Sequence, residues 1–176
     1  VGLDDRDAMG HWSLGRAQLL CREHDMAMES LDRALLANPN YAQGHYAKGY
    51  VGFHAGRDVS IVQELDMARR LSPFDPMMFA ISSARALTMA VSGQQQEAAR
   101  WAVRGTLQPN AHFHIFAIAA ICLELAGRHE EGLAQLARAS ERHPGYTRAI
   151  FFRSFPHKDE ARRRILEEAL SRLGMP

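Results

Sequence analysis

Histidines are the residues of this 176-residue chain with the widest range of possible chemistry. There are nine of them, and the closest pair is His112 and His114. Side chains two residues apart on a helix do not face the same way, and no Cys, Asp or Glu completes a metal-ligand set around them. The sequence therefore predicts neither a metal site nor a cofactor site, and the histidines are expected to cap helices or lie at the surface.

The sequence also lacks the patterns of nucleophilic, acid–base and phosphate chemistry. No Ser, His and Asp set stands on a recognisable nucleophile turn, and no glycine-rich phosphate loop follows a predicted strand. The acids Asp4 and Asp5, and likewise Glu167 and Glu168, are paired only in the sequence. Glu167 and Glu168 are expected to diverge, because adjacent positions on a helix do not face the same way. We expect the chain not to be an enzyme in its own right.

The charges give no sign of a nucleic-acid or membrane partner. Lys and Arg number 21 and Asp and Glu 20, so no strong overall field results. The run Arg162, Arg163 and Arg164 has acids three to four residues away, which predicts ordinary surface ion pairs. The longest apolar run, residues 115–125, is too short for a membrane span of roughly 18 to 20 residues. A soluble, cytoplasmic chain is expected.

The two cysteines, Cys21 and Cys122, both stand within apolar helical patterns and have no Cys or His at metal-ligand spacing. Both are expected to be buried thiols that act as small hydrophobic side chains. Such thiols agree with a reducing compartment.

The elements that would position any functional site repeat along the sequence with a period of 34 residues. Gly15 recurs as Gly49, Leu31 as Leu65 and Pro39 as Pro73. Each period holds two amphipathic helical patterns joined by a short turn. The proline ends the second helix, because it has no N–H and pushes the residue before it out of the helical region.

These patterns predict an all-α fold. The chain is expected to form one domain, an α-solenoid of about four helix–turn–helix units closed by a capping segment. The predicted units cover residues 7–40, 41–74, 76–110 and 111–145, and the capping segment covers residues 146–176. The predicted helices cover residues 7–21, 25–37, 41–54, 59–71, 76–91, 95–107, 113–126, 130–142, a short aromatic stretch 146–155, and 158–173.

Three local details accompany this prediction. Asp25 is expected to cap the second helix, and Pro76 to lie in the first turn of the fifth. The helix over residues 41–54 contains three glycines, each costing up to about 1 kcal/mol relative to Ala. Either packing stabilises that helix or it is mobile.

These residues give the chain a resemblance to tetratricopeptide repeat proteins over roughly residues 7–144. Their consensus matches Trp12, Leu14, Gly15, Ala27, Leu31, Ala34 and Pro39 in the first unit and Tyr46, Gly49, Leu65, Ala68 and Pro73 in the second. Lys48 and Ile61 depart from the consensus, and the third and fourth units match more loosely.

Residues 36–76 and the tail 155–176 also resemble the C-terminal repeat region of bacterial class III adenylate cyclase-like proteins and of related winged-helix regulators. This narrower resemblance implies a regulatory region that follows a catalytic or DNA-binding domain. The first residue is Val rather than Met, so we expect the chain to be a piece of a longer protein.

The resemblance further implies a concave surface lined by the first helix of each unit. The expected lining residues are Trp12, Arg16, Leu19, Tyr46, Tyr50, Phe53, His54, His114, Ile121 and Glu124. An aromatic groove with one or two charges suits an extended or helical apolar segment. The alternative is that these aromatic side chains only pack between units.

Some family members hold the C-terminal carboxylate of a chaperone with several cations and amides on successive first helices. This chain has Trp12, Tyr46 and Ser83 at those positions, and only Arg16 is of a suitable type. The sequence therefore disfavours that ligand class.

The leading hypothesis is a non-catalytic module for protein–protein interaction or oligomerisation, whose partner is a protein or peptide segment, a second copy of the chain included. The alternative is a small-molecule sensor that binds a metabolite near the lengthened joint at residues 74–76.

Overall fold

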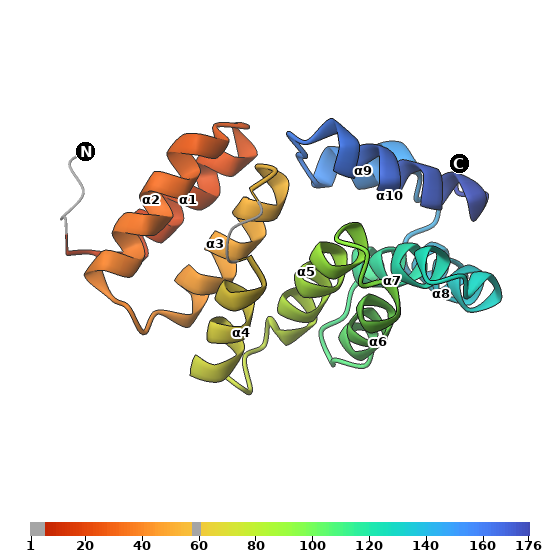
Figure 1. Ribbon diagram of the computed structural model, residues 1–176, viewed down its shortest axis with the longest axis horizontal. Coiled ribbons are helices and arrows are strands. Elements are labelled where there is room, and N and C mark those ends of the chain that lie inside the picture. Colours follow the sequence, from red (N-terminus) through yellow and green to blue (C-terminus); the bar gives the residue numbers. More distant parts are fainter. Residues whose placement is uncertain (1–5, 58–60) are drawn as a thin grey trace. The chain divides into compact units, whose positions relative to one another are not determined.

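The computed structural model describes residues 6–57 and 61–176, and every regular element within these ranges is a helix (Figure 1). The acids Asp4 and Asp5, the turn residue Asp58 and the predicted start of a helix at Val59 lie outside the described residues. The all-α prediction is confirmed.

Eight of the helices form four pairs of consecutive helices that pack against each other. The pairs are α1 (Ala8–Leu20) with α2 (His24–Ala37), α3 (Ala42–His54) with α4 (Ile61–Leu71), α5 (Met78–Val91) with α6 (Gln95–Thr106), and α7 (Phe113–Leu125) with α8 (His129–Arg142). The short α9 (Arg148–Ser154) and the longer α10 (Glu160–Arg172) follow. The predicted helix–turn–helix pairs are therefore present, with ends that differ from the prediction by a few residues at most.

The chain folds into two compact units, which we describe separately. The N-unit comprises Val1–Asp75 together with Pro156–Asp159, and the C-unit comprises Pro76–Phe155 and Glu160–Pro176. Four residues from between α9 and α10 thus belong to the N-unit although they are distant from it in the sequence.

The 34-residue period is visible in how the N-unit helices approach each other. A Cβ atom on Gly15 would lie 2.9 Å from Cγ of Leu31, and one on Gly49 would lie 2.9 Å from Cγ of Leu65. Both leucines are completely buried. Glycine at this position of the first helix is what allows the second helix to pack so closely, and the same contact recurs one period later.

The turns inside the pairs repeat as well. Gly56, Gly93 and Gly127 have positive φ angles of 73°, 83° and 75°. In the turn between α1 and α2 the left-handed residue is Arg22, with φ of 63°, and it is the one non-glycine residue of this kind in the described part of the chain. Since L side chains disfavour this region, Arg22 carries a local backbone strain that the other turns avoid.

In the C-unit, α7 is buried on nearly every side, as its uniformly apolar sequence predicts. It packs against α5, α6, α8 and α10. Glu124 of α7 pairs with Arg172 of α10 at 2.7 Å, and Leu173 follows α10 into contact with Gly132 of α8. The last helix therefore covers α7.

Three local predictions are wrong. Glu23 rather than Asp25 is the N-cap residue of α2, and the exposed Asp25 side chain pairs instead with Arg57 and Lys158. Pro76 precedes α5, whose N-cap is Met77. Cys21 is exposed, because it caps the C-terminal end of α1 beyond the buried stripe.

One further local prediction, on the second cysteine, is confirmed, and another, on the start of the last helix, is wrong. Cys122, the second cysteine, is buried as expected. The last helix starts at Glu160 rather than Lys158, because Pro156–Asp159 adopt a non-helical conformation and pack in the N-unit.

Candidate functional site

Four of the predicted lining residues come together on α1 and α3 of the N-unit. Trp12 and Arg16 are four residues apart on α1, and Tyr46 and Tyr50 are four apart on α3, so each pair shares one face of its helix. The Arg16 guanidinium carbon lies 5.1 Å from the centre of the Tyr50 ring. The Tyr46 and Tyr50 ring centres are 5.9 Å apart. We call these four residues the aromatic surface.

Burial separates the aromatic surface from the other predicted residues of the N-unit. Trp12, Arg16 and Tyr50 are half-buried, and Tyr46 is buried. Leu19, Phe53 and His54 are at most 2% exposed. These three side chains therefore belong to the packing beneath the surface, where Leu19 joins Val51 in a cluster that also contacts Trp12 and Tyr50.

The aromatic surface has hydrogen-bond donors that lack an acceptor. Nε1 of Trp12 and Nη1 of Arg16 are both buried and have no hydrogen-bond partner. Arg16 also forms no ion pair with any residue that the structure describes. Burial raises the pKa of Tyr46, and the nearby Arg16 opposes that rise; burial likewise raises the pKa of Tyr50. The phenols therefore remain neutral O–H groups at physiological pH.

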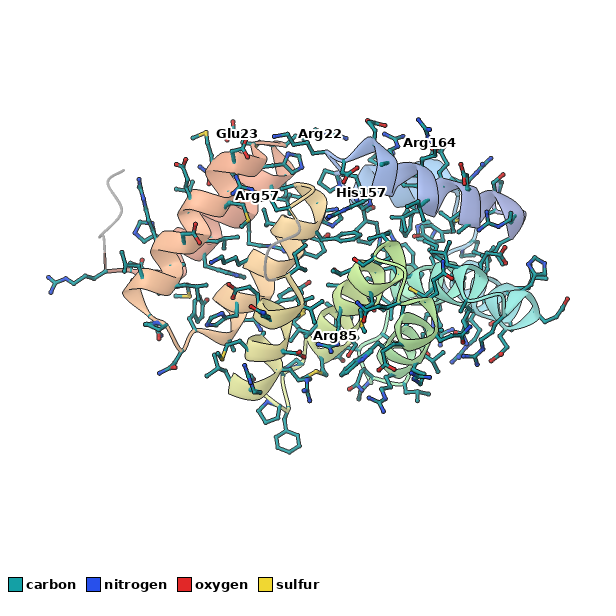
Figure 2. The ribbon with its side chains drawn as sticks, viewed as in Figure 1. Arg22, Glu23, Arg57, Arg85, His157 and Arg164 are labelled. Carbon is teal, nitrogen blue, oxygen red and sulfur yellow. The ribbon has the colours of Figure 1, made fainter. Side chains whose placement is uncertain are left out.

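A segment distant in the sequence packs against the C-terminal end of α3. Residues Pro156–Asp159, which we call the docked segment, have no regular secondary structure. The backbone N–H of Lys158 donates to the carbonyl oxygen of His54 at 2.8 Å. The carbonyl oxygen of Pro156 lies 2.7 Å from Nε2 of His24. In Figure 2 the labelled Arg22, Glu23 and His157 lie at this end of the N-unit.

Side chains of the docked segment add ring packing and one ion pair. The His157 ring centre is 4.5 Å from that of His54 and 5.5 Å from that of Phe53. Nζ of Lys158 lies 3.2 Å from Oδ2 of Asp25. The N-unit thus holds a non-helical stretch of chain by a backbone hydrogen bond, stacked rings and a surface charge pair.

His54, buried beneath this segment, is neutral. Burial, together with the nearby His157, His24 and Arg16, holds the pKa of His54 well below its ordinary value. Nδ1 of His54 lies 3.2 Å from Nδ1 of His157, so one ring donates an N–H to the lone pair of the other. Across residues 6–57 and 61–176, no three His, Cys, Asp or Glu side chains are grouped as metal ligands would be.

Sequence reasoning missed the docked segment and the roles of His24 and His157. Neither histidine follows the 34-residue period, and the segment contacts residues more than a hundred positions away. The one usable signal is Pro156, which is predicted to end the aromatic stretch before it. A proline followed by polar residues indicates a break in the helix, but it does not indicate what the break packs against.

The three predicted lining residues of the C-unit are buried or make their contacts within that unit. Ile121 is completely buried. The Glu124 side chain is 8% exposed and pairs with both Arg172 and His129. Nδ1 of His114 shares a hydrogen bond with the Tyr146 hydroxyl, and burial lowers the pKa of its imidazole to about 4. The C-terminal part of the chain therefore covers this stretch of α7.

Ser83, which stands where the chaperone-binding clamp would need a cation or an amide, is buried and donates to the carbonyl oxygen of Phe79. Its hydroxyl is engaged within α5. None of the described helices is long and apolar enough to cross a lipid bilayer.

Comparison with known proteins gives matches at the level of structure. No protein-family model matches the sequence, and the curated proteins contain no significant match. TTC0263, a thermophilic TPR protein from Thermus thermophilus, is similar with a TM-score of 0.67 and 23% identity, over 94% of this chain and 82% of that chain. YrrB, described as a TPR protein with an unusual peptide-binding site, is similar with a TM-score of 0.63 and 18% identity, over 97% of this chain and 86% of that chain.

MamA is similar with a TM-score of 0.64 and 13% identity, over 98% of this chain and 94% of that chain. These likenesses show that the chain has the tetratricopeptide-repeat fold, so the predicted fold is confirmed. The comparisons give no support to the predicted adenylate cyclase or transcriptional-regulator context.

Proposed function

We propose that this chain is a non-catalytic protein-interaction module that binds an extended peptide segment on the aromatic surface formed by Trp12, Arg16, Tyr46 and Tyr50. The observation that carries the proposal is the docked segment. The N-unit already holds a non-helical stretch of polypeptide at the end of α3 through a backbone hydrogen bond and ring packing, both with His54, whose ring also packs against Tyr50. A partner segment would use the same kinds of contact along the remaining face of α1 and α3.

The chemistry of the aromatic surface supports this use. Half-buried Trp, Tyr and Arg side chains offer large contact areas with polar tips and lose little conformational entropy when they bind, which is why they dominate protein interfaces. Trp12 and Tyr50 rest on a buried aliphatic cluster that holds them in place. Such pre-positioned rings favour binding, because a partner does not have to order them.

The wider setting is proposed on sequence resemblance alone. The chain would act in the bacterial cytoplasm as the C-terminal regulatory region of a cyclase-like or transcriptional regulatory protein. Its partner would be a protein or peptide segment, a second copy of the chain included.

The function is tested by selecting short random peptides against the full chain and measuring their affinity by fluorescence anisotropy. We expect Tyr50→Ala to weaken a selected peptide about 10- to 100-fold, as truncation of a central interface residue does. Phe74→Ala is the matched control, because the Phe74 side chain is 96% exposed and lies outside the aromatic surface.

Circular dichroism must show that both variants are folded. Equal affinities of the wild type and Tyr50→Ala for every selected peptide would overturn the assignment of the surface. The absence of any selectable peptide would overturn the function itself.

A further inference from the structure

One side of α1 is exposed and carries no charged residue. Met9 is 64% exposed, Leu14 38% and Leu20 77%, and Ser13 and Ala17 between them are exposed as well. Their spacing places these five residues, which we call the α1 face, on the side of the helix away from its contact with α2. Three of the seven exposed large hydrophobic side chains of the described residues lie on it. Such a concentration on one helix face marks an interaction surface.

The repeat relates the α1 face to a surface of α3 that another helix covers. Every residue of α1 has a counterpart 34 positions later in α3, and the two helices have the same length. The counterparts of the central residues of the α1 face are Ala47, Lys48 and Val51. Ala47 and Val51 are completely buried, because α2 packs against α3 on this side (Figure 1).

The contacts of α2 on α3 follow one side of α2. A Cβ atom on Gly44 would lie 2.8 Å from Cδ2 of Leu35, and Nζ of Lys48 lies 2.8 Å from Oδ1 of Asp32. One buried cluster includes two residues of α2 and two of α3, which are Met28, Leu31, Ala47 and Val51. Positions 28, 31, 32 and 35 share one side of a helix. A helix on this surface therefore offers side chains at positions i, i+3, i+4 and i+7.

The α1 face differs from its counterpart at one position that decides what it accepts. Gly10 stands where α3 has Gly44, so a large apolar side chain has the same room there. Leu14 stands where α3 has Lys48, and it has no charge to pair with an acid. The residue that takes the place of Asp32 is therefore apolar. A helix that fits the α1 face has apolar residues at all four positions and polar residues on its opposite side.

A second copy of the chain does not supply such a helix from its other pairs. The second helices of the four pairs are α2, α4, α6 and α8, and the apolar side of each is already buried. The same holds for α10. Within residues 6–57 and 61–176, no helix of this kind has a free apolar side. The occupant of the α1 face is therefore a helix that a different polypeptide segment brings.

We propose that the α1 face binds an amphipathic helix of a partner protein, packed on α1 as α2 packs on α3. The partner helix runs antiparallel to α1, and its apolar residues lie along the line from Ala17 to Gly10. The α1 face is separate from the aromatic surface, and this proposal does not rest on the proposed function. It adds a second binding surface to the N-unit, one that recognises a helix rather than an extended segment.

The experiment uses a library of helical peptides selected on the full chain. The peptides have an Ala-, Glu- and Lys-rich frame of three to four turns, which favours the helix, and are randomised at positions i, i+3, i+4 and i+7. We expect Leu, Ile, Met or Phe to be enriched at all four positions. Ala17→Glu should weaken a selected peptide at least about tenfold, because it places a charge in the middle of the apolar contact.

The control variants use exposed positions, so that the fold is preserved. Ala137→Glu is the matched control for Ala17→Glu, since Ala137 is an exposed alanine on α8, and it should change the affinity by less than about twofold. Tyr50→Ala, on the aromatic surface, should also change it by less than about twofold. Ser13→Glu serves in place of Ala17→Glu if circular dichroism shows that the latter is unfolded.

A selection on Leu14→Lys tests the correspondence between α1 and α3. This variant gives α1 the lysine that α3 has at Lys48, which pairs with Asp32. We expect the residue enriched at position i+4 to change from apolar to Asp or Glu, while the other three positions stay apolar. An unchanged apolar preference at i+4 would show that the helix does not bind as α2 does, and would overturn the proposal.

The remaining outcomes also decide. Failure to select any helical peptide, or binding that Ala17→Glu leaves unchanged, would overturn the proposal. Binding lost in Tyr50→Ala but kept in Ala17→Glu would assign the helix to the aromatic surface instead. Dimerisation of the chain alone in analytical ultracentrifugation, abolished by Ala17→Glu, would assign the α1 face to a second copy. Failure to select extended peptides on the aromatic surface would overturn the proposed function and leave this proposal standing.

Discussion

Replacing Gly49 by Ala tests whether the close approach of α3 and α4 is a packing requirement. The added Cβ would lie 2.9 Å from both Cγ and Cδ2 of Leu65 and 3.2 Å from the backbone carbonyl oxygen of Ile61. Leu65 is completely buried and cannot turn its branch point away within its pocket. Because the third contact is with backbone, the two helices must move apart.

The expected magnitude follows from two opposing effects. Overpacking of a buried contact costs about 1–3 kcal/mol, whereas Gly→Ala inside a helix stabilises by about 1 kcal/mol. Contacts with a branch point and with backbone favour the upper part of the first range. We expect Gly49→Ala to lower the free energy of unfolding by about 1–2 kcal/mol, which corresponds to a melting temperature lower by roughly 2–8 °C.

Gly52 provides the matched control on the same helix. A Cβ there would meet Cγ1 of Ile61 at 3.4 Å, an ordinary contact, so only the gain in helix propensity remains. Gly52→Ala is expected to raise the melting temperature by roughly 1–4 °C. Thermal unfolding followed by circular dichroism at the helix band measures both variants. A Gly49→Ala variant as stable as the wild type would refute the packing argument, and a destabilised Gly52→Ala would show that α3 needs backbone freedom instead.

Three further predictions concern the turn, the histidines and the ion pairs. Arg22→Gly should raise the unfolding free energy by about 0.5–1 kcal/mol in urea titration, because glycine adopts the positive φ without strain; a lower stability would contradict this. The pKa values of His54 and His114 are held below the ordinary value of about 6.5, so the unfolded state binds more protons and stability should fall by about 1 kcal/mol or more as the pH drops from 7 towards 4. A melting temperature that is constant between pH 7 and 5 would contradict this. Glu124→Gln should lower the free energy of unfolding by about 1–3 kcal/mol, because the Glu124 side chain is only 8% exposed. Asp25→Asn changes a side chain that is 64% exposed and should leave the urea midpoint unchanged. Equal effects of the two variants would show that burial does not decide how much these ion pairs stabilise the fold.

The helices and their pairing could be predicted because the relevant signals are local and periodic. Gly15 and Gly49 stand where a Cβ would meet Leu31 and Leu65, so the sequence period and the packing contact have one cause. Glycine also stands in three of the turns inside the pairs, where the positive φ angle favours that residue type. Arg22 shows the limit of this signal, since the same backbone conformation occurs there without glycine.

The candidate site could be predicted only in part. Spacing of four residues on α1 and α3 places Trp12 and Arg16 on one face, and Tyr46 and Tyr50 on another. Spacing could not separate these side chains from Phe53, which was expected to line the same surface but is buried. Burial depends on which distant residues pack against each position.

The docked segment is the clearest case of such a distant contact. His157 packs on His54 across about a hundred residues of sequence, and no pattern within either stretch encodes that pairing. The covered surface of α7 has the same origin, because Arg172 pairs with Glu124 from the far end of the C-unit. Local periodicity specifies the helices, whereas contacts of this kind are specified by the whole chain.

The central claim is that an extended peptide binds across α1 and α3, and hydrogen exchange of the full chain with and without a selected peptide tests it most directly. We expect the peptide to slow amide exchange in α1 and α3, including the glycine-containing stretch from Gly44 to Gly52, and to leave exchange in α7 unchanged. Protection confined to α7 and α10, or no change in α1 and α3 at saturating peptide, would contradict the claim.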